Sequence, residues 1–358
     1  MAREMKDSGI EWIGEIPCDW SIAPLKRIAS IQTGSTPSKT DEAILYSNEI
    51  GLPWIKAENL GSNYPIIKTK EYLTDDGSKI GRTFAQNTVY VCCIASVGKV
   101  GYSTIPASCN QQINALSFKN FDWKYGYYMT CSQETEYLLN ASGNVMKILN
   151  SEKQSMIMCP IPPLPEQHRI ADFLDRKCAE IDRVLEKTRA SIEEYKKLKK
   201  AVINKAVTRG IRGKRKLKDS RIDWIKQIPD EWNICNPKAL FLQRKDKAKE
   251  GERQLTASQN YGVVYQDEYM EMTGQKVVTV EKDFSILKHV EVGDFVISMR
   301  SFQGGLEYST KNGSISSAYV MLIPNLEKVF PRFFRWLLKS SLYINALQST
   351  SDLVRDGQ

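Results

Sequence analysis

This sequence of 358 residues lacks several features on which whole classes of protein depend. No apolar run approaches the roughly 18 residues of a membrane span, and Met1–Asp7 lacks the apolar centre of a signal peptide. Histidine is scarce: His168 and His289 lie far apart, and no cysteines show the C-x-x-C spacing of zinc or redox sites. These absences predict a cytoplasmic protein without membrane association, with no metal site, and with free, mostly buried thiols.

The usual catalytic motifs are also absent from the sequence. There is no G-x-x-x-x-G-K-[ST] loop, no G-x-G-x-x-G, no G-x-S-x-G and no H-E-x-x-H. Asn236-Pro237-Lys238 only partly resembles the Asn-Pro-Pro-aromatic loop of adenine methyltransferases. The paired carboxylates Glu193-Glu194 and Asp75-Asp76 fit a helix surface and a turn, where solvation accounts for them. We therefore predict a non-enzyme with no catalytic residue and no cofactor of its own.

Positive charge is concentrated in one segment. The chain has a formal charge of +8, and Tyr195–Ser220 holds eleven lysines and arginines with the single acid Asp219. Such a run is ordinarily a solvated surface. It also suits a polyanion, because each neutralised phosphate releases counterions. The remaining composition, 42% apolar and 26% charged, is that of a folded protein with room for two domains.

An internal repeat divides the chain into two halves. Lys6–Trp20 (KDSGIEWIGEIPCDW) and Lys218–Trp232 (KDSRIDWIKQIPDEW) share nine of fifteen positions at an offset of 212 residues. Weaker echoes follow in the same order at an offset of 206: Gly98–Thr104 matches Gly304–Thr310, Asn110–Leu116 matches Ser316–Leu322, and Tyr137 matches Tyr343. The halves are predicted to be two copies of one fold, with a shared framework and different loops.

Each half is predicted to be mixed α/β, which places the chain in the α+β class. Apolar runs rich in β-branched and aromatic residues predict strands at Arg27–Gln32, Thr88–Ala95, Ala115–Phe118, Lys276–Val280 and Asp294–Met299. Clusters such as Thr33–Pro37 and Thr74–Gly77 predict turns between them. Helices are expected at Trp123–Leu139 and Pro331–Leu347.

A long helix is predicted between the halves. Cys159–Pro165 is a proline-rich extended approach, and Pro165 suits the first helical position. From there apolar residues repeat at alternating spacings of four and three, the pattern of a coiled coil, until Gly210 and Gly213 end the helix. At about 1.5 Å per residue the helix is roughly 65 Å long. Its seam, the predicted interface with another helix, includes Leu174, Ile181, Leu185, Ile192, Tyr195 and Val202. Packing of this helix on its own domain is the alternative.

Together these segments resemble the specificity subunit of type I restriction–modification systems. The resemblance is carried by the repeated Ile10–Trp20 and Ile222–Trp232, by Pro162–Asp175 (PPLPEQHRIADFLD) and by Glu193–Lys205 (EEYKKLKKAVINK). It covers nearly the whole chain and is highly specific. It implies a first target-recognition domain at residues 1–165, a conserved spacer helix at 166–209 and a second target-recognition domain at 210–358.

The resemblance also implies the partners. Double-stranded DNA is read as a split site, and methyltransferase subunits dock on the conserved helices and carry the S-adenosylmethionine chemistry. Restriction subunits bring ATP- and magnesium-dependent translocation and cleavage. In the family a second proline-rich turn and a second long helix follow the second domain, and this sequence lacks them. The uncovered seam is therefore expected to pair with a second copy, making a homodimer, or with a separately encoded C-terminal fragment.

Two other functional classes fit part of the sequence. A coiled-coil scaffold without a DNA role explains the long helix but neither the duplicated halves nor the basic segment. A stand-alone DNA methyltransferase or nuclease needs the motifs that are missing.

Candidate DNA contacts are polar loop residues at which the halves differ. Asparagine and glutamine can bond adenine at two atoms, and arginine can do the same with guanine. The candidates of the first half are Ser35, Thr36, Ser38, Lys39, Lys56, Lys99, Asn110, Gln111 and Gln112. Those of the second half are Gln259, Asn260, Tyr261, Arg300, Gln303 and Lys311.

Overall fold

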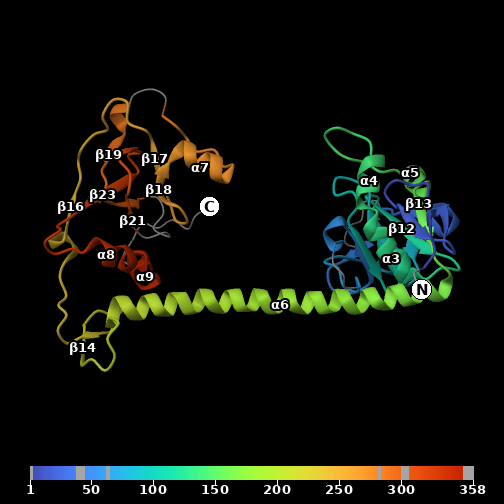
Figure 1. The fold of residues 1–358 in the computed structure, drawn as a ribbon, viewed down its shortest axis with the longest axis horizontal. Helices are drawn as coiled ribbons and strands as arrows, with labels where there is room; N and C mark the ends of the chain where they lie inside the picture. The colour runs from blue at the N-terminus through green and yellow to red at the C-terminus, as the bar shows by residue number, and fades with distance from the viewer. Residues whose placement is uncertain (1–2, 38–44, 62–64, 281–283, 300–305, 350–358) are drawn as a thin grey trace. The chain divides into compact units, whose positions relative to one another are not determined.

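The computed structural model describes residues 3–37, 45–61, 65–280, 284–299 and 306–349 (Figure 1). It separates into two units, Met1–Glu186 (unit 1) and Lys187–Gln358 (unit 2). The division falls inside the long helix α6 (Leu164–Arg209), so that each unit contains one part of this helix. The predicted α+β class is confirmed, while the predicted assignment of three separate parts stays a prediction.

Unit 1 consists of short strands and helices that precede α6. Its strands are β1 (Met5–Asp7), β2 (Glu15–Pro17), β3 (Ser21–Pro24), β4 (Ala29–Thr33), β5 (Tyr46–Ser47), β6 (Leu52–Ile55), β7 (Tyr72–Leu73), β8 (Thr83–Phe84), β9 (Thr88–Cys92), β10 (Val100–Ser103), β11 (Ala107–Cys109), β12 (Ile113–Phe118) and β13 (Met158–Ile161). Its helices before α6 are η1 (Leu25–Arg27), η3 (Ala57–Asn59), α2 (Asp75–Ile80), α3 (Trp123–Ser132), α4 (Glu134–Asn140) and α5 (Ser151–Ser155).

The main sheet of unit 1, in the order β10-β9-β12-β4, is buried on both faces. Along β9 the side chains alternate, as they must in a strand: Val89 and Val91 enter one apolar cluster, Tyr90 and Cys92 another. The first cluster includes Tyr125 and Met129 of α3, which lies against this sheet. The second joins the five-stranded sheet β5-β7-β6-β11-β8. Burial on both faces explains why β9 reads as a continuous apolar run.

Unit 2 repeats this plan, with three strands of its main sheet (β16, β20 and β21) shorter than their counterparts in unit 1. Its strands are β14 (Leu217–Asp219), β15 (Gln227–Pro229), β16 (Phe241–Gln243), β17 (Leu255–Ser258), β18 (Gly262–Tyr265), β19 (Lys288–Val290), β20 (Phe295–Ser298), β21 (Glu307–Tyr308), β22 (Gly313–Ile315) and β23 (Tyr319–Pro324). Its helices are η4 (Pro237–Ala239), α7 (Gln266–Thr273), η5 (Phe284–Ile286), α8 (Pro331–Leu337) and α9 (Ser341–Ser349). The sheet order β16-β23-β20-β21 corresponds to β4-β12-β9-β10 of unit 1. The predicted repeat is therefore confirmed in the fold.

The first hairpins of the two units, β1–β2 and β14–β15, have the same strand register and the same hydrogen bond at the turn. Lys6 pairs with Ile16 across β1 and β2, and Lys218 pairs with Ile228 across β14 and β15, so the register is identical at the offset of the repeat. The serine that follows each first strand, Ser8 or Ser220, accepts a hydrogen bond from the backbone N–H two residues later, at 3.1 Å in both copies. The identities in the sequence thus specify one turn geometry twice.

Helix α6 begins and ends close to the predicted residues. The buried Gln167 anchors its start, because its amide donates to the Pro162 carbonyl at 2.9 Å and its Oε1 accepts from the Asp122 N–H at 2.9 Å. The helix ends at Arg209, followed by Gly210 at φ +71°, a left-handed position that favours glycine. No helix of the described residues is long and apolar enough to cross a membrane.

Several predicted elements are corrected by the structure. The helix predicted at Trp123–Leu139 is two helices, α3 and α4, because the buried Gln133 between them turns its side chain inward to Cys159 and Tyr137. The one predicted at Pro331–Leu347 is likewise divided into α8 and α9. The Thr74–Gly77 turn is instead the start of α2, where the Thr74 hydroxyl accepts from the Gly77 N–H at 3.1 Å.

The strand predicted at Lys276–Val280 does not form. Its last residue pairs with a side chain in place of a neighbouring strand: the Gln254 amide donates to the Val280 carbonyl at 2.7 Å and accepts from its N–H at 2.9 Å. The eight cysteines are all free, and Cys92, Cys93, Cys109 and Cys159 are the buried ones. The buried share is therefore half rather than most.

Candidate nucleic-acid interface

Strand order brings the predicted contact loops of unit 1 to one end of its main sheet. Asn114 at the start of β12 pairs with Thr33 at the end of β4, and Ile113 pairs with Cys92 at the end of β9. The neighbouring strand β10 begins at this same end with Val100, which pairs with Val91. The loops that hold the predicted residues therefore leave the sheet together; they carry Ser35, Thr36, Lys99, Asn110, Gln111 and Gln112.

Direct contacts join two of these loops. The Thr36 hydroxyl donates to Oε1 of Gln111, and the Ser35 N–H donates to the Cys109 carbonyl at 2.9 Å. The loops approach so closely at Gly34 that an added Cβ would lie 2.3 Å from the carbonyl oxygens of Cys109 and Asn110. Only glycine permits this approach, so Gly34 is what sets these polar side chains beside one another.

The Asn110–Gln112 loop is held in shape by its own side chains. The Asn110 amide donates to Gln112 Oε1, and its oxygen accepts from the Gln112 N–H, each at 3.1 Å. The Asn110 N–H donates to the Ile55 carbonyl at the end of β6, also at 3.1 Å. Gln111 stays exposed at the tip. A fixed loop with an exposed amide is suited to reading a hydrogen-bonding pattern.

The lysines and the arginine near the contact loops of unit 1 have different surroundings. Lys56 follows β6, but its ammonium lies 2.6 Å from Glu71 and 4.7 Å from the centre of the Trp54 ring. Lys99 is exposed. Arg82, which is not among the contacts predicted from the sequence, donates from its backbone to Ser35 Oγ at 2.8 Å and from its guanidinium to the Thr33 carbonyl. Nothing in the local sequence marks Arg82, because only the fold brings β8 to this loop.

The predicted residues of unit 2 are only partly brought together. Gln259, Asn260 and Tyr261 form the turn between β17 and β18. The Lys339 ammonium donates to the Gln259 carbonyl at 3.2 Å and to Glu307, at the start of β21, at 2.8 Å. This turn therefore lies at the end of the sheet that corresponds to the loops of unit 1. Of the remaining candidates, Ser38, Lys39, Arg300 and Gln303 lie outside the described residues.

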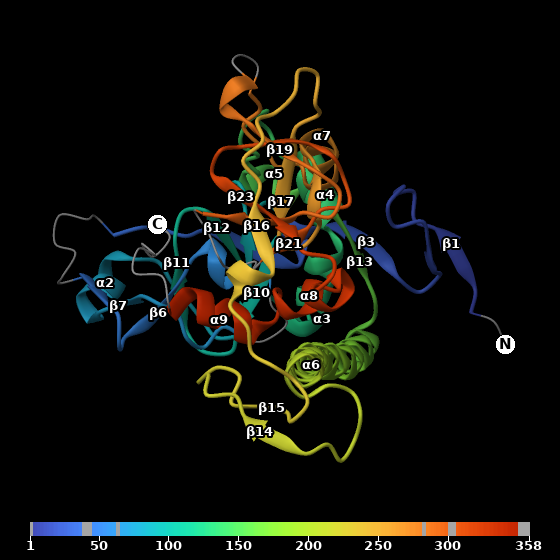
Figure 2. The same cartoon turned by 90° about the vertical axis from the view of Figure 1, so that its left-hand side faces the viewer.

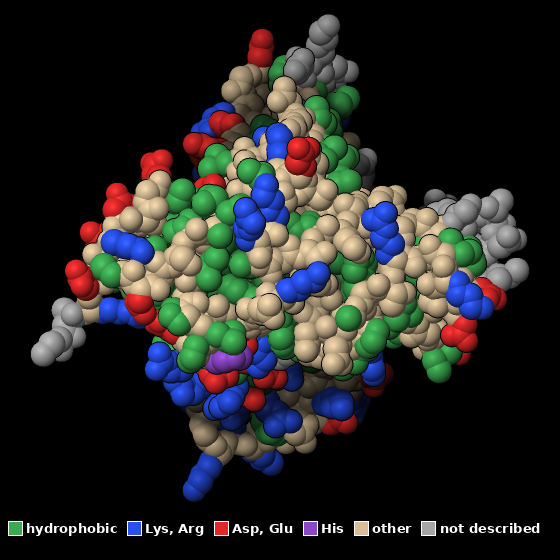
Figure 3. Space-filling model, turned by 90° about the vertical axis from the view of Figure 1, so that its right-hand side faces the viewer, with side chains coloured by type: hydrophobic (Ala, Val, Ile, Leu, Met, Phe, Trp, Pro, Cys, Tyr) green, Lys and Arg blue, Asp and Glu red, His purple; other side chains and the backbone are tan. Residues whose placement is uncertain are grey.

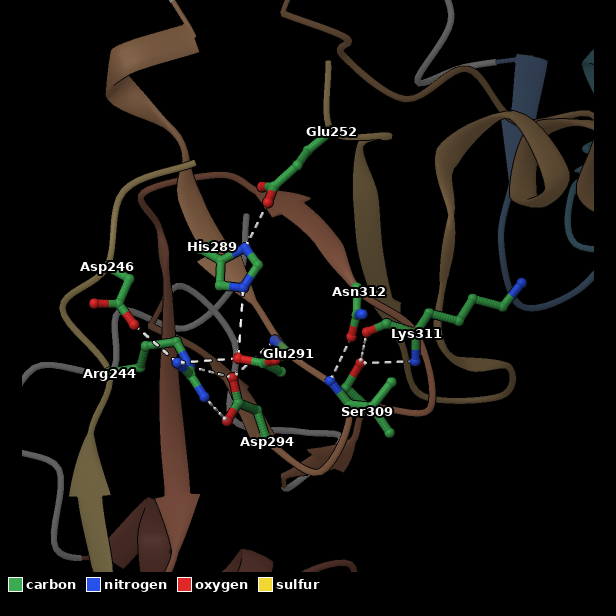
Figure 4. A network of polar contacts seen from close by, with 10 residues as sticks. Arg244, Asp246, Glu252, His289, Glu291, Asp294, Ser309, Lys311 and Asn312 are labelled. Atoms are coloured by element: carbon green, nitrogen blue, oxygen red, sulfur yellow. Dashed lines mark hydrogen bonds and ion pairs between the residues drawn. The ribbon is translucent and has the colours of Figure 1, made fainter. Parts of the chain in front are cut away.

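Lys311 lies at the opposite end of the unit 2 sheet, beyond Tyr308, which pairs with the first residue of β20. Its ammonium lies 2.6 Å from Glu268 and 4.3 Å from the centre of the Tyr265 ring. Figure 4 shows its side chain extending away from the neighbouring polar network. In unit 2, then, the structure separates Lys311 from the other described candidates.

That polar network stabilises the far end of the unit 2 sheet. Arg244 donates to both oxygens of the buried Asp294, at 2.6 and 3.0 Å, and lies 2.8 Å from Asp246 (Figure 4). The hydrogen bond with Asp294 is the main cause that raises the pKa of Arg244 above its ordinary value. His289 lies 2.7 Å from Glu252. Among the described residues no group of three or more histidine, cysteine or acidic side chains could hold a metal ion.

The seam of α6 is exposed in this single chain. Ile181, Tyr195 and Val202 expose 58%, 72% and 57% of their surface, and Leu185 and Ile192 expose 48% each. Leu174, near the start of the helix, is partly buried.

Figure 3 shows one face of the molecule, on which lysine and arginine side chains are densest in the lower part and are interspersed with acids.

An apolar hollow of about 420 Å³ lies in unit 2. It is lined by residues of the β14–β15 hairpin, which Figure 2 shows beside α6, and by Val207 and Thr208 in the last turns of that helix. Its lining includes Trp224, Trp232, Ile234, Phe334 and Tyr343. In unit 1 the corresponding segment, β3, pairs with β13. In unit 2 the counterpart of β3, residues 233–236, pairs with no strand of the described residues, and Ile234 is 47% exposed.

Comparison with known proteins finds one family. Residues 17–194 match the type I restriction modification DNA specificity domain. The chain is 25% identical over 166 residues to the type I restriction enzyme EcoprrI specificity subunit of Escherichia coli, covering 43% of this chain and 41% of that protein. A Methanocaldococcus jannaschii protein assigned as the MjaX type I restriction enzyme specificity subunit is 24% identical over 312 residues, covering 80% of this chain and 70% of that protein.

A solved structure, the HsdS subunit from Thermoanaerobacter tengcongensis, has a TM-score of 0.43 and 20% identity and covers 56% of this chain and 47% of that one. The region of similarity to the EcoprrI subunit covers less than half of that subunit's length. The match to the archaeal relative is longer than either unit, and so it draws on both. The chain belongs to the family of type I restriction–modification DNA specificity subunits.

Proposed function

We propose that this chain is the DNA-reading subunit of a type I restriction–modification complex. Unit 1 reads one half of a split site and unit 2 reads the other. Partner subunits perform adenine methylation and restriction in the cytosol, and they hold the S-adenosylmethionine, ATP and magnesium. One observation carries this proposal: two units of the same fold, in a chain of this family, present unlike polar loops at the same end of equivalent sheets.

The pairing of like folds with unlike loops suits a bipartite site. The start of β12 carries Asn110-Gln111-Gln112, and the equivalent start of β23 carries Ser316-Ser317-Ala318. Amide and hydroxyl side chains present different patterns of donors and acceptors to base edges. Two such readers would therefore recognise two different half-sites rather than a palindrome.

The cations of α6 and of the segment that follows it have a different role in this proposal. Lys196, Lys197, Lys199 and Lys200 are exposed on the helix. Exposed ammonium groups attract phosphates without regard to sequence and make binding strongly dependent on salt. The helix would act as the spacer between the readers and as a dock for the methyltransferase subunits.

The test is a mobility-shift titration of the complex with methyltransferase subunits. Duplexes that hold the host's methylated motif are compared with scrambled duplexes across a salt series. We expect the complex to prefer the motif at every salt concentration, while the isolated chain binds both duplexes weakly. Equal affinity of the complex for the two duplexes would refute the proposal.

The exposed seam of α6 requires a partner. Burying a fully exposed large apolar side chain yields about 1.5–3 kcal/mol, and five residues of the seam still expose from about half to nearly three quarters of their surface. The occupant we propose is the same helix of a second copy, running antiparallel by two-fold symmetry. A separately encoded fragment with a long helix is the alternative, and the apolar hollow beside residues 233–236 would give such a fragment a place to dock.

Light scattering of the purified chain separates these outcomes. A dimer without a co-purifying peptide supports the second copy, and a co-purifying helical peptide supports the fragment. The double substitution Leu185→Asp and Ile192→Asp should dissociate the dimer and leave unit 1 folded. Lys187→Asp, an exposed position off the seam, is the matched control. A monodisperse monomer at micromolar concentration would contradict both occupants.

A further inference from the structure

A groove of about 570 Å³ lies in unit 2 where β20 ends and β23 begins. All four residues of strand β17 line it. The extended segment Gln275–Val278 lines one part of it, and Ser298 with Ser316–Tyr319 lines another. Of the lining residues, Gln259 is a contact predicted from the sequence and the others are not.

The lining of this groove is polar but almost uncharged. Its hydrogen-bonding groups are amides and hydroxyls, those of Ser258, Gln259, Gln266, Tyr269, Gln275 and Ser316. Methyl groups of Ala257, Val277 and Ala318 lie among them, and Lys276 is the one charged residue of the described lining. Phosphates are held by cations, whereas base edges offer neutral donors and acceptors and the thymine methyl group. The chemistry of the groove therefore matches bases rather than the DNA backbone.

Gln275 is held in a defined orientation. The Tyr269 hydroxyl donates to its Oε1 at 3.1 Å, and its backbone N–H donates to Thr273 Oγ1 at 3.2 Å. Tyr269 is itself braced by the Tyr261 ring, edge-on at 6.0 Å. Within the described residues the Gln275 Nε2 has no partner, and Oε1 keeps a second lone pair. An amide with a free donor and a free acceptor can bond both N7 and N6 of adenine.

A second side-chain amide in the groove, that of Gln266, has an oxygen without a hydrogen-bond donor among the described residues. Gln266 is 8% exposed, and its Oε1 has no hydrogen-bond donor among the described residues, although its Nε2 reaches the Leu255 carbonyl at 3.5 Å. A buried acceptor without a donor is unfavourable. A donor carried by a ligand in the groove would complete it.

The position of the groove agrees with that of the candidate loops of unit 1. Ser316–Tyr319 leads into β23, just as the Asn110–Gln112 loop leads into the equivalent β12. Both units would then present the same end of their sheets to DNA.

We propose that this groove reads base edges in the major groove of one half-site, that Gln275 recognises an adenine there, and that Tyr269 is its positioning residue. The proposal rests on the function proposed above and adds to it the recognition surface of unit 2.

The experiment measures methylation by the assembled complex on a library in which every position of both half-sites is randomised. The native chain is compared with Gln275→Ala, with Tyr269→Phe, and with Gln348→Ala as control, an exposed glutamine on α9. Gln275→Ala should reduce methylation of the preferred site by about 10- to 100-fold and abolish the preference for A at one position of one half-site. Tyr269→Phe should weaken that same preference by a few-fold, and Gln348→Ala should leave the profile unchanged.

Three other outcomes overturn the inference. If Gln275→Ala leaves the base profile unchanged while the native complex keeps a bipartite preference, the groove is not the reader, and the proposed function stands. If Gln275→Ala slows methylation of all sites equally, its role is structural. If the native complex shows no base preference in either half-site, the proposed function itself fails.

Discussion

Units 1 and 2 share a hairpin, but they attach it to the rest of the chain differently. In unit 1, Arg3 donates to Asp19 at 2.8 Å and to Glu166 in the first turn of α6, and its guanidinium lies 5.9 Å from the centre of the Trp20 ring. In unit 2 the equivalent Arg215 lies 3.3 Å from Glu231, its one acidic partner among the described residues. The hairpin is thus tied to the start of α6 in unit 1, whereas in unit 2 the equivalent arginine pairs within the hairpin segment itself.

The cores of the two units also differ in how completely they enclose one equivalent tyrosine. Tyr137 in unit 1 is fully buried and donates to Gln133 at 2.8 Å, whereas its counterpart Tyr343 lines the apolar hollow of unit 2 and contacts Trp224 edge-on. A repeated sequence signal therefore specifies where a side chain points, while neighbouring segments decide how completely it is enclosed.

The largest effect expected from this comparison comes from removing these two rings. Tyr137→Ala should cost about 3–5 kcal/mol of unfolding free energy, because it leaves a closed cavity. Tyr343→Ala should cost about 1–2 kcal/mol, because the site is already open on one side. Denaturant titrations with hydrogen exchange to resolve the units would measure both. Equal costs would show that the cores are equally closed.

Base reading and spacing can be separated by a second pair of substitutions. Gln111→Ala, at the exposed tip of the unit 1 loop, should weaken methylation of one half-site by about 1–3 kcal/mol if it makes a paired base contact. Lys199→Ala on α6 should act on all sequences alike through phosphates or the partner dock. Methylation rates on half-site variants test this. A shared pattern of losses would contradict the division between reader and spacer.

The hairpins offer a smaller test at their turns. Gly9 and Gly14 of unit 1 have φ +70° and +68°, and unit 2 places Arg221 and Lys226 at the same positions with φ +59° and +63°. A side chain in this left-handed region costs about 1–2 kcal/mol, which glycine avoids at some entropic cost. Arg221→Gly and Lys226→Gly should each stabilise unit 2 by up to about 1 kcal/mol, while Gly9→Ala should destabilise unit 1. Thermal unfolding of the three variants would decide, and destabilisation by both glycines would oppose the reasoning.

The smallest expected effect is a pH dependence confined to unit 2. At the position of Gly101 in unit 1, unit 2 has the buried Glu307, 2.7 Å from Lys339; burial raises the pKa of this carboxyl above its usual 4.5, and Lys339 opposes the rise. The folded state therefore holds the proton more tightly than the unfolded chain does. The stability this contributes is complete below about pH 4.5 and is lost as the pH rises through the folded pKa.

Glu307→Gln should remove that contribution. The free energy of unfolding of unit 2, measured from pH 4 to 7, should change less with pH in the variant than in the native chain, and unit 1 should be unaffected. Identical pH profiles for the variant and the native chain would show that Glu307 does not titrate differently on folding.

Sequence patterns that extend over a few residues predicted the elements whose structure depends on near neighbours in the chain. The repeated hairpins and α6 follow from side-chain spacing, caps and prolines that act within a few residues. The strand at Lys276–Val280 was wrong because its pairing partner is the side chain of Gln254, which no propensity encodes. The breaks next to Gln133 and Ser340 depend on buried polar side chains that local pattern does not reveal.

The candidate site was predictable to the extent that its loops are rich in amides. Asn110–Gln112, Ser35 and Thr36 are brought together because β4 and β12 are neighbours, and their contacts require Gly34. The location of Lys311 at the other end of its sheet, and the bracing of Gln275 by Tyr269, depend on strand order and on contacts from separate elements. Such contacts are specified by the whole fold and not by the residues on either side.

The left-handed residues of the unit 2 hairpin also bear on how the two hairpins respond to a protease. Arg221 and Lys226 are basic, exposed, and held at strained turn positions, so this hairpin opens locally at low cost and offers trypsin two cleavage sites. The same turn of unit 1 has Gly9 and Gly14 there and offers none. Limited digestion would therefore cut the unit 2 hairpin before the unit 1 hairpin, and a cut there releases a fragment that keeps unit 1 with the entire long helix.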